Sequence, residues 1–214
     1  MLLVMLLALS CAACGVNGAP QASPAPSAAP AATPAAAPET EAAPETESGS
    51  ELHHVEISIR DYGTVKLELD AAAAPVTVQN FLDLAGRGFY DGLTFHRIMD
   101  GFMIQGGDPE GRGTGGSGTN IQGEFAANGW DNPISHKKGV ISMARARSYD
   151  SASSQFFICV GDAEFLDGQY AAFGRVTEGM EIVEQIARDA RPIDNNGTIP
   201  AEQQPVIESI KVID

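Results

Sequence analysis

Arg97 and Gln105 are the two long polar side chains of an otherwise mostly apolar stretch, residues 95–108, and are the first candidates for chemistry. A guanidinium group offers five N–H donors, and a primary amide offers both donors and an acceptor. Side by side, these groups suit a neutral ligand that carries amides better than a metal ion or a phosphate. Whether they lie side by side depends on the turn between them.

That turn contains Asp100-Gly101, a dipeptide typical of β-hairpins. Because strand side chains alternate between two faces, a two-residue loop would leave Arg97 and Gln105 on opposite faces. A three-residue loop that also includes Phe102 would pair Arg97 with Gln105, with Phe102 and Met103 as apolar lining. We favour the three-residue loop because it places a cationic donor beside an amide on one face.

The elements that must hold this hairpin are short strands and two helices. A helix is predicted from Pro75, because proline favours the first helical turn, with an apolar 3–4 repeat that Gly86 and Gly88 end. A second helix is predicted over residues 178–188. Alternating or short buried runs predict strands over 55–59, 65–69, 139–144, 155–160, 171–176 and 206–213. Without βαβ alternation, this pattern predicts a mainly β fold, an antiparallel barrel capped by helices.

Charge separates the chain into two parts. The first fifty residues contain no Lys or Arg and only four acidic side chains, so the net charge of –15 leaves –11 on residues 51–214 (–15 plus 4). Binding to nucleic acid needs a basic surface, so we expect no nucleic-acid partner. A single domain over 51–214 is long enough for a sizeable apolar core.

Residues 1–14 resemble the signal peptide of a bacterial lipoprotein. The apolar run Met1–Leu9 is too short to span a bilayer, and Cys14 follows two alanines and precedes a glycine. Cys14 is therefore the predicted lipidation site, with Cys11 as the alternative; a cleaved secretory peptide with incidental cysteines is the simpler alternative. The resemblance implies a lipid anchor in the cell membrane, with the domain on the extracytoplasmic side.

Residues 15–50 are rich in proline, alanine, serine and threonine, and they hold seven of the thirteen prolines. Their largest apolar side chain is a single valine, so burial of apolar surface cannot offset the conformational entropy that ordering would cost. They are predicted to form a disordered tether between the signal segment and the domain.

Several segments of the domain carry a family resemblance. They are Phe95-His96-Arg97, residues 101–108, Ser142-Met143-Ala144, residues 154–158 and Leu166-Asp167-Gly168 with Phe173-Gly174. In order and spacing they resemble the signature segments of cyclophilins, the peptidyl-prolyl cis/trans isomerases, over residues 53–213. The resemblance implies a closed eight-stranded antiparallel barrel with a helix over each end and a groove for proline-containing peptides. It implies no cofactor and no metal, and we expect a monomer.

The resemblance also assigns roles to positions. It implies that Arg97 is the catalytic arginine and that Gln105 holds the substrate backbone. It implies a proline pocket walled by Phe102, Met103, Phe157 and Leu166. It implies an adjoining groove for the residues before proline, formed by Ala144, Arg145, Ala146 and Gln155.

Three positions of the predicted substrate site depart from the family's frequent residues. Phe165 replaces a tryptophan, Tyr170 replaces a histidine, and Arg145 replaces an asparagine. Loss of the indole N–H at Phe165 predicts weak binding of cyclosporin-like macrocycles. Tyr170 keeps an aromatic wall with a polar tip, whereas the sequence does not indicate what the Arg145 side chain adds.

Other motifs lead to no second chemistry. Residues 111–116 fit G-x-G-x-x-G but neither follow a parallel strand nor open a helix, so nucleotide binding is not predicted. The four histidines show no metal-ligand spacing, His96 should face away from Arg97, and Cys159 lies in an apolar run typical of a buried thiol. The competing interpretation of the domain is a non-catalytic module that binds proline-containing segments or acts as an assembly scaffold.

Overall fold

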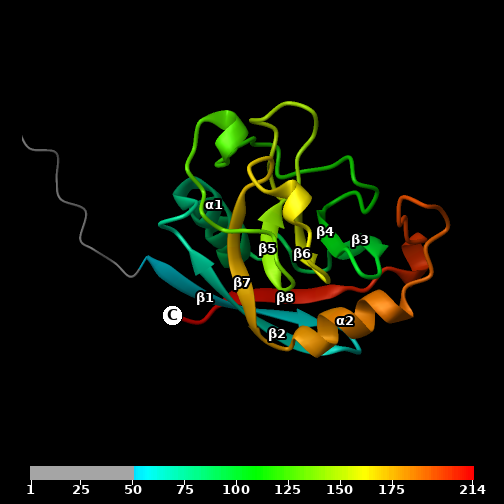
Figure 1. The fold of residues 1–214 in the computed structure, drawn as a ribbon. Helices are drawn as coiled ribbons and strands as arrows, with labels where there is room; N and C mark the ends of the chain where they lie inside the picture. Colours follow the sequence, from blue (N-terminus) through cyan, green and yellow to red (C-terminus); the bar gives the residue numbers. More distant parts are fainter. Residues whose placement is uncertain (1–50) are drawn as a thin grey trace, which may run out of the picture. The chain divides into compact units, whose positions relative to one another are not determined.

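The computed structural model describes residues 51–214, so the predictions for the signal segment and the tether fall outside the described residues. Figure 1 shows strands wrapped around a central core, with two helices set apart from each other. The strands are β1 (Leu52–Ile59), β2 (Gly63–Asp70), β3 (Thr94–Met99), β4 (Met103–Asp108), β5 (Val140–Met143), β6 (Phe156–Cys159), β7 (Ala172–Glu178) and β8 (Ile207–Val212). The helices are α1 (Pro75–Gly86) and α2 (Met180–Asp189). Short 3-10 turns occupy Ala126–Asn128, Glu164–Leu166 and Ala201–Gln203.

All eight strands form one antiparallel sheet in the order β3-β4-β6-β5-β7-β2-β1-β8. The sheet curls until its edge strands meet at a bridge between Thr94 and Val206. Beside it, the Phe95 N–H donates to Pro205 O at 3.0 Å and the Ile207 N–H donates to Leu93 O at 2.8 Å. The predicted mainly β architecture of eight antiparallel strands with two helices is confirmed, as a curled sheet, or half-barrel, whose edges are joined by these few bonds and not by a full ladder.

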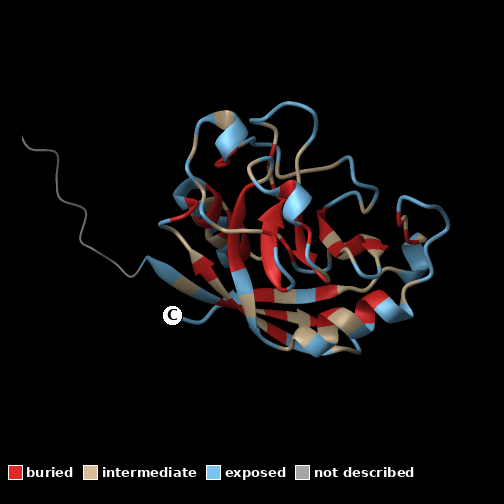
Figure 2. Ribbon diagram, in the orientation of Figure 1, coloured by how far each residue is buried: buried red, intermediate tan, exposed pale blue. Residues whose placement is uncertain are grey.

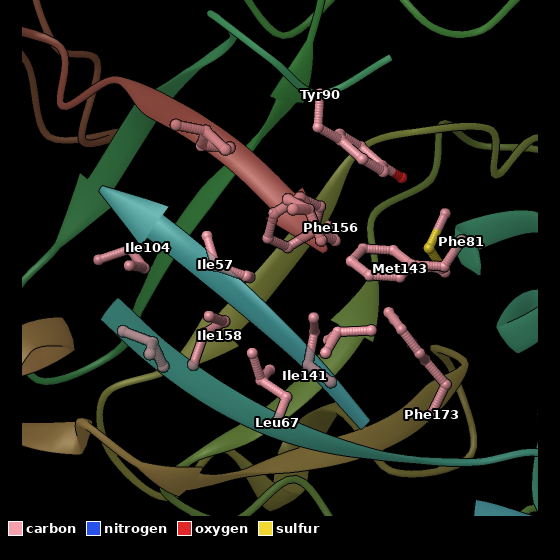
Figure 3. Packing of buried hydrophobic residues seen from close by; sticks show 14 of the residues in the cluster. Ile57, Leu67, Phe81, Tyr90, Ile104, Ile141, Met143, Phe156, Ile158 and Phe173 are labelled. Carbon is pink, nitrogen blue, oxygen red and sulfur yellow. The ribbon is translucent and has the colours of Figure 1, made fainter. Parts of the chain in front are cut away.

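The core lies inside the curled sheet, where buried residues concentrate in Figure 2. In β1 and β2 the apolar residues of the alternating pattern are buried and the intervening polar ones are not, because successive side chains face opposite sides of a strand. Phe81 of α1 reaches into this interior, with its ring 5.5 Å from Phe156 and 5.3 Å from Phe173. Figure 3 shows these rings in the same buried cluster as Ile57 and Leu67 of the opening strands.

Both helices begin close to their predicted starts. In α1 the Val76 and Thr77 N–H groups donate to the buried carboxylate of Glu124 at 2.9 and 2.8 Å, which satisfies donors that a helix start leaves free. The second helix begins at Met180 instead of residue 178, because Gly179 has a left-handed backbone with φ +84°. None of the helices within residues 51–214 is long and apolar enough to cross a membrane.

Candidate active site

The β3–β4 hairpin has the three-residue turn that the sequence favoured. Met99 pairs with Met103, Ile98 with Ile104, and Arg97 with Gln105. The turn is closed by the Phe102 N–H, which donates to Met99 O at 3.0 Å, and Gly101 supplies a positive φ of +75°. The predicted pairing is confirmed, so the guanidinium and the amide lie on one face.

Four groups hold the Arg97 side chain. Its Nη1 donates to Gln105 Oε1 at 3.1 Å, and its Nε donates to the Asn196 carbonyl at 2.7 Å. Two sulfur atoms complete the set, with Met99 3.3 Å from Nη2 and Met103 3.8 Å from Nη1. Partial burial lowers the pKa of Arg97 from its ordinary value, but arginine stays protonated at neutral pH. The result is a fixed, partly desolvated cation at the edge of a pocket.

That pocket has a volume of about 330 Å³, and the predicted residues line it. Ten of the twelve predicted catalytic and substrate-binding residues do so: Arg97, Phe102, Met103, Gln105, Ala144, Arg145, Phe157, Phe165, Leu166 and Tyr170. Its floor belongs to a small apolar cluster in which Met103, Phe157 and Leu166 are buried. Phe165 is 72% exposed and lies at the rim, with its ring centre 5.5 Å from that of Phe102 and the two rings tilted by 35°. The family resemblance assigns this space to a proline ring, and we call it the proline pocket.

The other two predicted residues, Ala146 and Gln155, line an adjoining pocket of about 470 Å³ that shares Gln105, Ala144 and Arg145 with the first. An amide relay connects the two spaces. Gln105 Nε2 donates to Gln155 Oε1 at 3.0 Å, and Gln155 Nε2 donates to the Gly115 carbonyl at 2.8 Å. The relay fixes Gln105 from one side while Arg97 fixes it from the other, so its amide is pre-oriented before any ligand arrives.

The glycine-rich segment that follows β4 forms a wall of the adjoining pocket. Asp108, at the end of β4, accepts backbone N–H bonds from Glu110, Arg112, Gly113 and Thr114 at 2.5 to 3.0 Å. Burial raises the pKa of Asp108, but the backbone donors outweigh it and hold the pKa below its usual value. The G-x-G-x-x-G spacing thus belongs to a loop wrapped around a carboxylate. An aspartate directly before a glycine-rich run is the signal that could have predicted this role.

Two groups near the site escaped the sequence reasoning. The Asn196 carbonyl that holds Arg97 is a backbone atom and leaves no mark in the sequence. His136 is buried and bonds to Asp167 Oδ1 at 2.8 Å and to Ser142 Oγ at 3.0 Å, while its ring stacks on Phe157. These contacts anchor the floor of the proline pocket from behind.

The prediction of a buried thiol at Cys159 is confirmed, and His96 is buried as well. His96 is buried at an irregularity of the β3–β4 pairing between Phe95 and Arg97, and neither of its ring nitrogens has a hydrogen-bond partner among the described residues. Burial lowers the pKa of His96. Burial also raises the pKa of the Cys159 thiol to about 12, which makes it unreactive. Within residues 51–214, no group of three acidic, histidine or cysteine side chains could hold a metal ion.

Comparison with known proteins identifies the family to which this pocket belongs. The family model described as "Cyclophilin type peptidyl-prolyl cis-trans isomerase/CLD" matches residues 54–212. This chain belongs to that family. It is therefore a peptidyl-prolyl cis-trans isomerase, an enzyme.

Proteins similar to this cyclophilin come from several organisms. The peptidyl-prolyl cis-trans isomerase of Helicobacter pylori is 44% identical over 145 residues, which cover 64% of this chain and 86% of that protein. Peptidyl-prolyl cis-trans isomerase B of Bacillus subtilis is 45% identical over 129 residues, covering 60% and 87%. The crystal structure of a cyclophilin-type isomerase from Cryptosporidium parvum matches with a TM-score of 0.67 at 30% identity, covering 76% of this chain and 98% of that one.

Proposed function

We propose that this cyclophilin is a membrane-tethered enzyme that accelerates rotation about X-Pro bonds in exported proteins and so assists their folding. The observation that supports the proposal best is the position of Arg97. Its guanidinium is held 3.1 Å from the Gln105 amide at the edge of a pocket lined by apolar side chains. This pairing supplies a cationic donor beside a cavity of suitable character for a proline ring.

The physics of the X-Pro bond indicates what such a site must do. Amide resonance sets a rotation barrier of about 18–20 kcal/mol, so unaided isomerisation takes tens to hundreds of seconds. No bond breaks, and the catalyst needs only to bind the twisted amide more tightly than either planar form. In the twisted state the proline nitrogen becomes pyramidal and gains a basic lone pair. Arg97 would donate to that lone pair and stabilise the twisted state selectively.

One charge-assisted hydrogen bond contributes roughly 1.5–3 kcal/mol, or about one to two decades in rate. The remaining acceleration must come from positioning. Phe102, Met103, Phe157 and Leu166 would grip the proline ring, while Gln105 would hold the backbone of the preceding residues, so that only one side of the bond rotates. The apolar walls also exclude water and strengthen the contact from Arg97.

Proline-containing peptide is the substrate class that we propose. One crystal structure of the Cryptosporidium parvum cyclophilin was determined in the presence of the dipeptide Ala-Pro; it matches this chain with a TM-score of 0.66 at 30% identity, covering 75% of this chain and 99% of that one. Unfolded segments of exported proteins would present the same chemistry to a domain held outside the membrane.

The activity is tested by NMR exchange between the cis and trans forms of a short Ala-Pro peptide, with the full chain at catalytic concentration. We expect the cis and trans lines to broaden and merge on addition of the protein. An intact fold with no acceleration would overturn the catalytic proposal and favour a module that binds proline segments without turnover.

The membrane anchor is tested separately. We expect the intact mass of protein extracted from membranes to include a lipid on Cys14, and Cys14→Ser to release the protein from the membrane. Cys11→Ser is the matched control and should leave the anchor in place. Loss of the anchor in Cys11→Ser alone would move the site to Cys11, and a mature protein without a lipid would overturn the anchor altogether.

A further inference from the structure

Arg145 is the one departure from the family pattern that carries a full charge, and the structure shows what holds it. Its Cζ atom lies 5.1 Å from the ring centre of Phe125, 5.1 Å from that of Tyr149 and 4.7 Å from that of Tyr170. Its Nε donates to the Gln169 carbonyl at 3.0 Å, and its Nη1 donates to the Ala146 carbonyl at 3.1 Å. Contact with three rings and two carbonyl groups fixes the plane of the guanidinium.

The fixed guanidinium stands at the boundary between the two pockets. Arg145 lines both the proline pocket and the adjoining pocket. A peptide whose proline ring fills the first pocket and whose chain continues into the second must therefore pass this side chain. Two of the five N–H donors of Arg145 are used by the carbonyl groups, which leaves three for a ligand.

The charges around the site make this position unusual for the domain. Residues 51–214 carry a net charge of –11, yet the proline pocket is lined by two arginines, Arg97 and Arg145, and by no carboxylate. Neither arginine forms an ion pair with the described residues. The adjoining pocket includes one carboxylate, Glu110, which is already paired with Arg112 at 2.8 Å.

We propose that Arg145 is a specificity-determining residue that favours proline segments with a carboxylate within two residues of the proline, on the side that enters the adjoining pocket. The inference rests on the proposed function of the same groove. In a domain with excess negative charge, an acidic segment is repelled by most of the surface. A fixed, unpaired guanidinium in the groove reverses that repulsion at one position, and its free donors can bond a carboxylate directly.

The experiment uses a host peptide, Ala-Ala-Ala-Pro-Ala-Ala, with Glu placed in turn at each of the two positions before and the two positions after the proline. Each Glu peptide is matched by a Gln peptide of the same shape without the charge. The readout is the ratio of catalysed cis/trans exchange rates, Glu over Gln, by NMR at peptide concentrations well below saturation. Because each ratio is taken within one protein, a general change in activity cancels.

For the native chain we expect a ratio of about five at one or both positions on one side of the proline, since a partly buried ion pair lies between exposed and buried magnitudes. Arg145→Gln should bring that ratio to about one, and Arg145→Lys should keep part of it, because the ammonium retains charge but not the planar fork. Arg147→Gln is the matched control. Arg147 is exposed, lies two residues from Arg145 and lines neither pocket, so the Glu/Gln rate ratio of the Arg147→Gln variant should stay at the native value.

Salt gives a readout that needs no variant. Raising NaCl from about 0.05 to 0.5 M should reduce the native ratio toward one by screening. A native ratio near one at all four positions, with the neutral peptide still accelerated, would overturn the preference and leave the isomerase proposal intact. A ratio that Arg145→Gln does not change would overturn the role of Arg145. If Arg145→Gln does not fold, a Glu/Gln ratio that does not change with salt in the native chain would overturn the role of Arg145 instead. A native chain that accelerates no peptide would overturn the proposed function, and this inference with it.

Discussion

Replacement of Arg97 by alanine tests the centre of the proposed mechanism. The variant removes one of the two cations that border the proline pocket but none of the apolar walls. If Arg97 donates one charge-assisted hydrogen bond to the twisted amide, its loss removes about 1.5–3 kcal/mol of transition-state stabilisation. At 1.36 kcal/mol for each decade, the expected loss in kcat/KM is about 10- to 100-fold. The Ala-Pro exchange assay described above measures it.

The fold should survive this change. Arg97 is half-buried, and its shortest contact is to the Asn196 carbonyl in an exposed turn, where water can replace the guanidinium. We therefore expect the free energy of unfolding to fall by no more than about 1 kcal/mol. Arg97→Lys should lose most of the activity as well, because one ammonium cannot reproduce the bonds to Asn196 and Gln105 together. Arg147→Ala, the control, should stay within about twofold of the native rate.

A double-mutant cycle separates direct action from positioning. Gln105 Oε1 accepts a bond from Arg97 Nη1, so part of the effect of Gln105→Ala should come from a less well-ordered guanidinium. The loss from Gln105→Ala should then be smaller in the Arg97→Ala background than in the native chain. Native activity in a folded Arg97→Ala variant would refute the assignment of the donor, whatever the cycle shows.

Three further variants test the surrounding structure. Asp108→Ala should lower the free energy of unfolding by about 2–4 kcal/mol in urea melts, because four backbone N–H groups lose their acceptor. The pKa of Asp108 is lowered in the folded state, so this stability is present above about pH 4 and is lost as the pH falls below it. Plots of unfolding free energy against pH for the native chain and the variant should therefore converge in acid, and a constant difference would contradict the reasoning. Burial lowers the pKa of His96, so its contribution to the free energy of unfolding should be complete above about pH 6.5 and decline as the pH falls below it. His96→Phe should therefore reduce the slope of unfolding free energy against pH between pH 7 and 5. An equal slope in the variant would show that His96 does not titrate in this range. Phe165→Trp restores an indole donor at the exposed rim of the pocket and should tighten binding of a cyclosporin-like macrocycle about tenfold by calorimetry, whereas equal affinities would contradict the role assigned to that N–H.

Much of the scaffold could be predicted because strand periodicity permits few alternatives. The side-chain period of two means that a one-residue slip in the β3–β4 hairpin would place Gln105 on the wrong face from Arg97. The choice of a three-residue turn therefore determined the register, which the pairing of these residues bears out. Buried alternation in β1 and β2 limited the opening strands in the same way.

Long-range polar contacts could not be predicted by the same reasoning. The Asn196 carbonyl that holds Arg97 lies 99 positions away in the chain, and every residue type offers such a carbonyl. Glu124, which binds the start of α1, is 47 positions from Thr77 and comes from no recognisable capping motif. Rules for local sequence predict hydrogen bonds between residues close in the chain, whereas the bonds of Arg97 and Glu124 form only when distant segments meet in the folded sheet.

The contacts of Arg145 show why a change of side chain can alter selection without altering chemistry. The three rings that surround its guanidinium come from separate segments, around Phe125, Tyr149 and Tyr170, so no sequence window contains the site. Arg145 carries its charge at the boundary of the two pockets, in the segment that follows β5, whereas the proposed donor to the twisted amide, Arg97, belongs to β3. The charge of Arg145 would change which proline segments bind, according to the residues that flank the proline, while Arg97 stabilises the rotating amide. Neutral peptides should therefore report on the donor, and acidic peptides on Arg145.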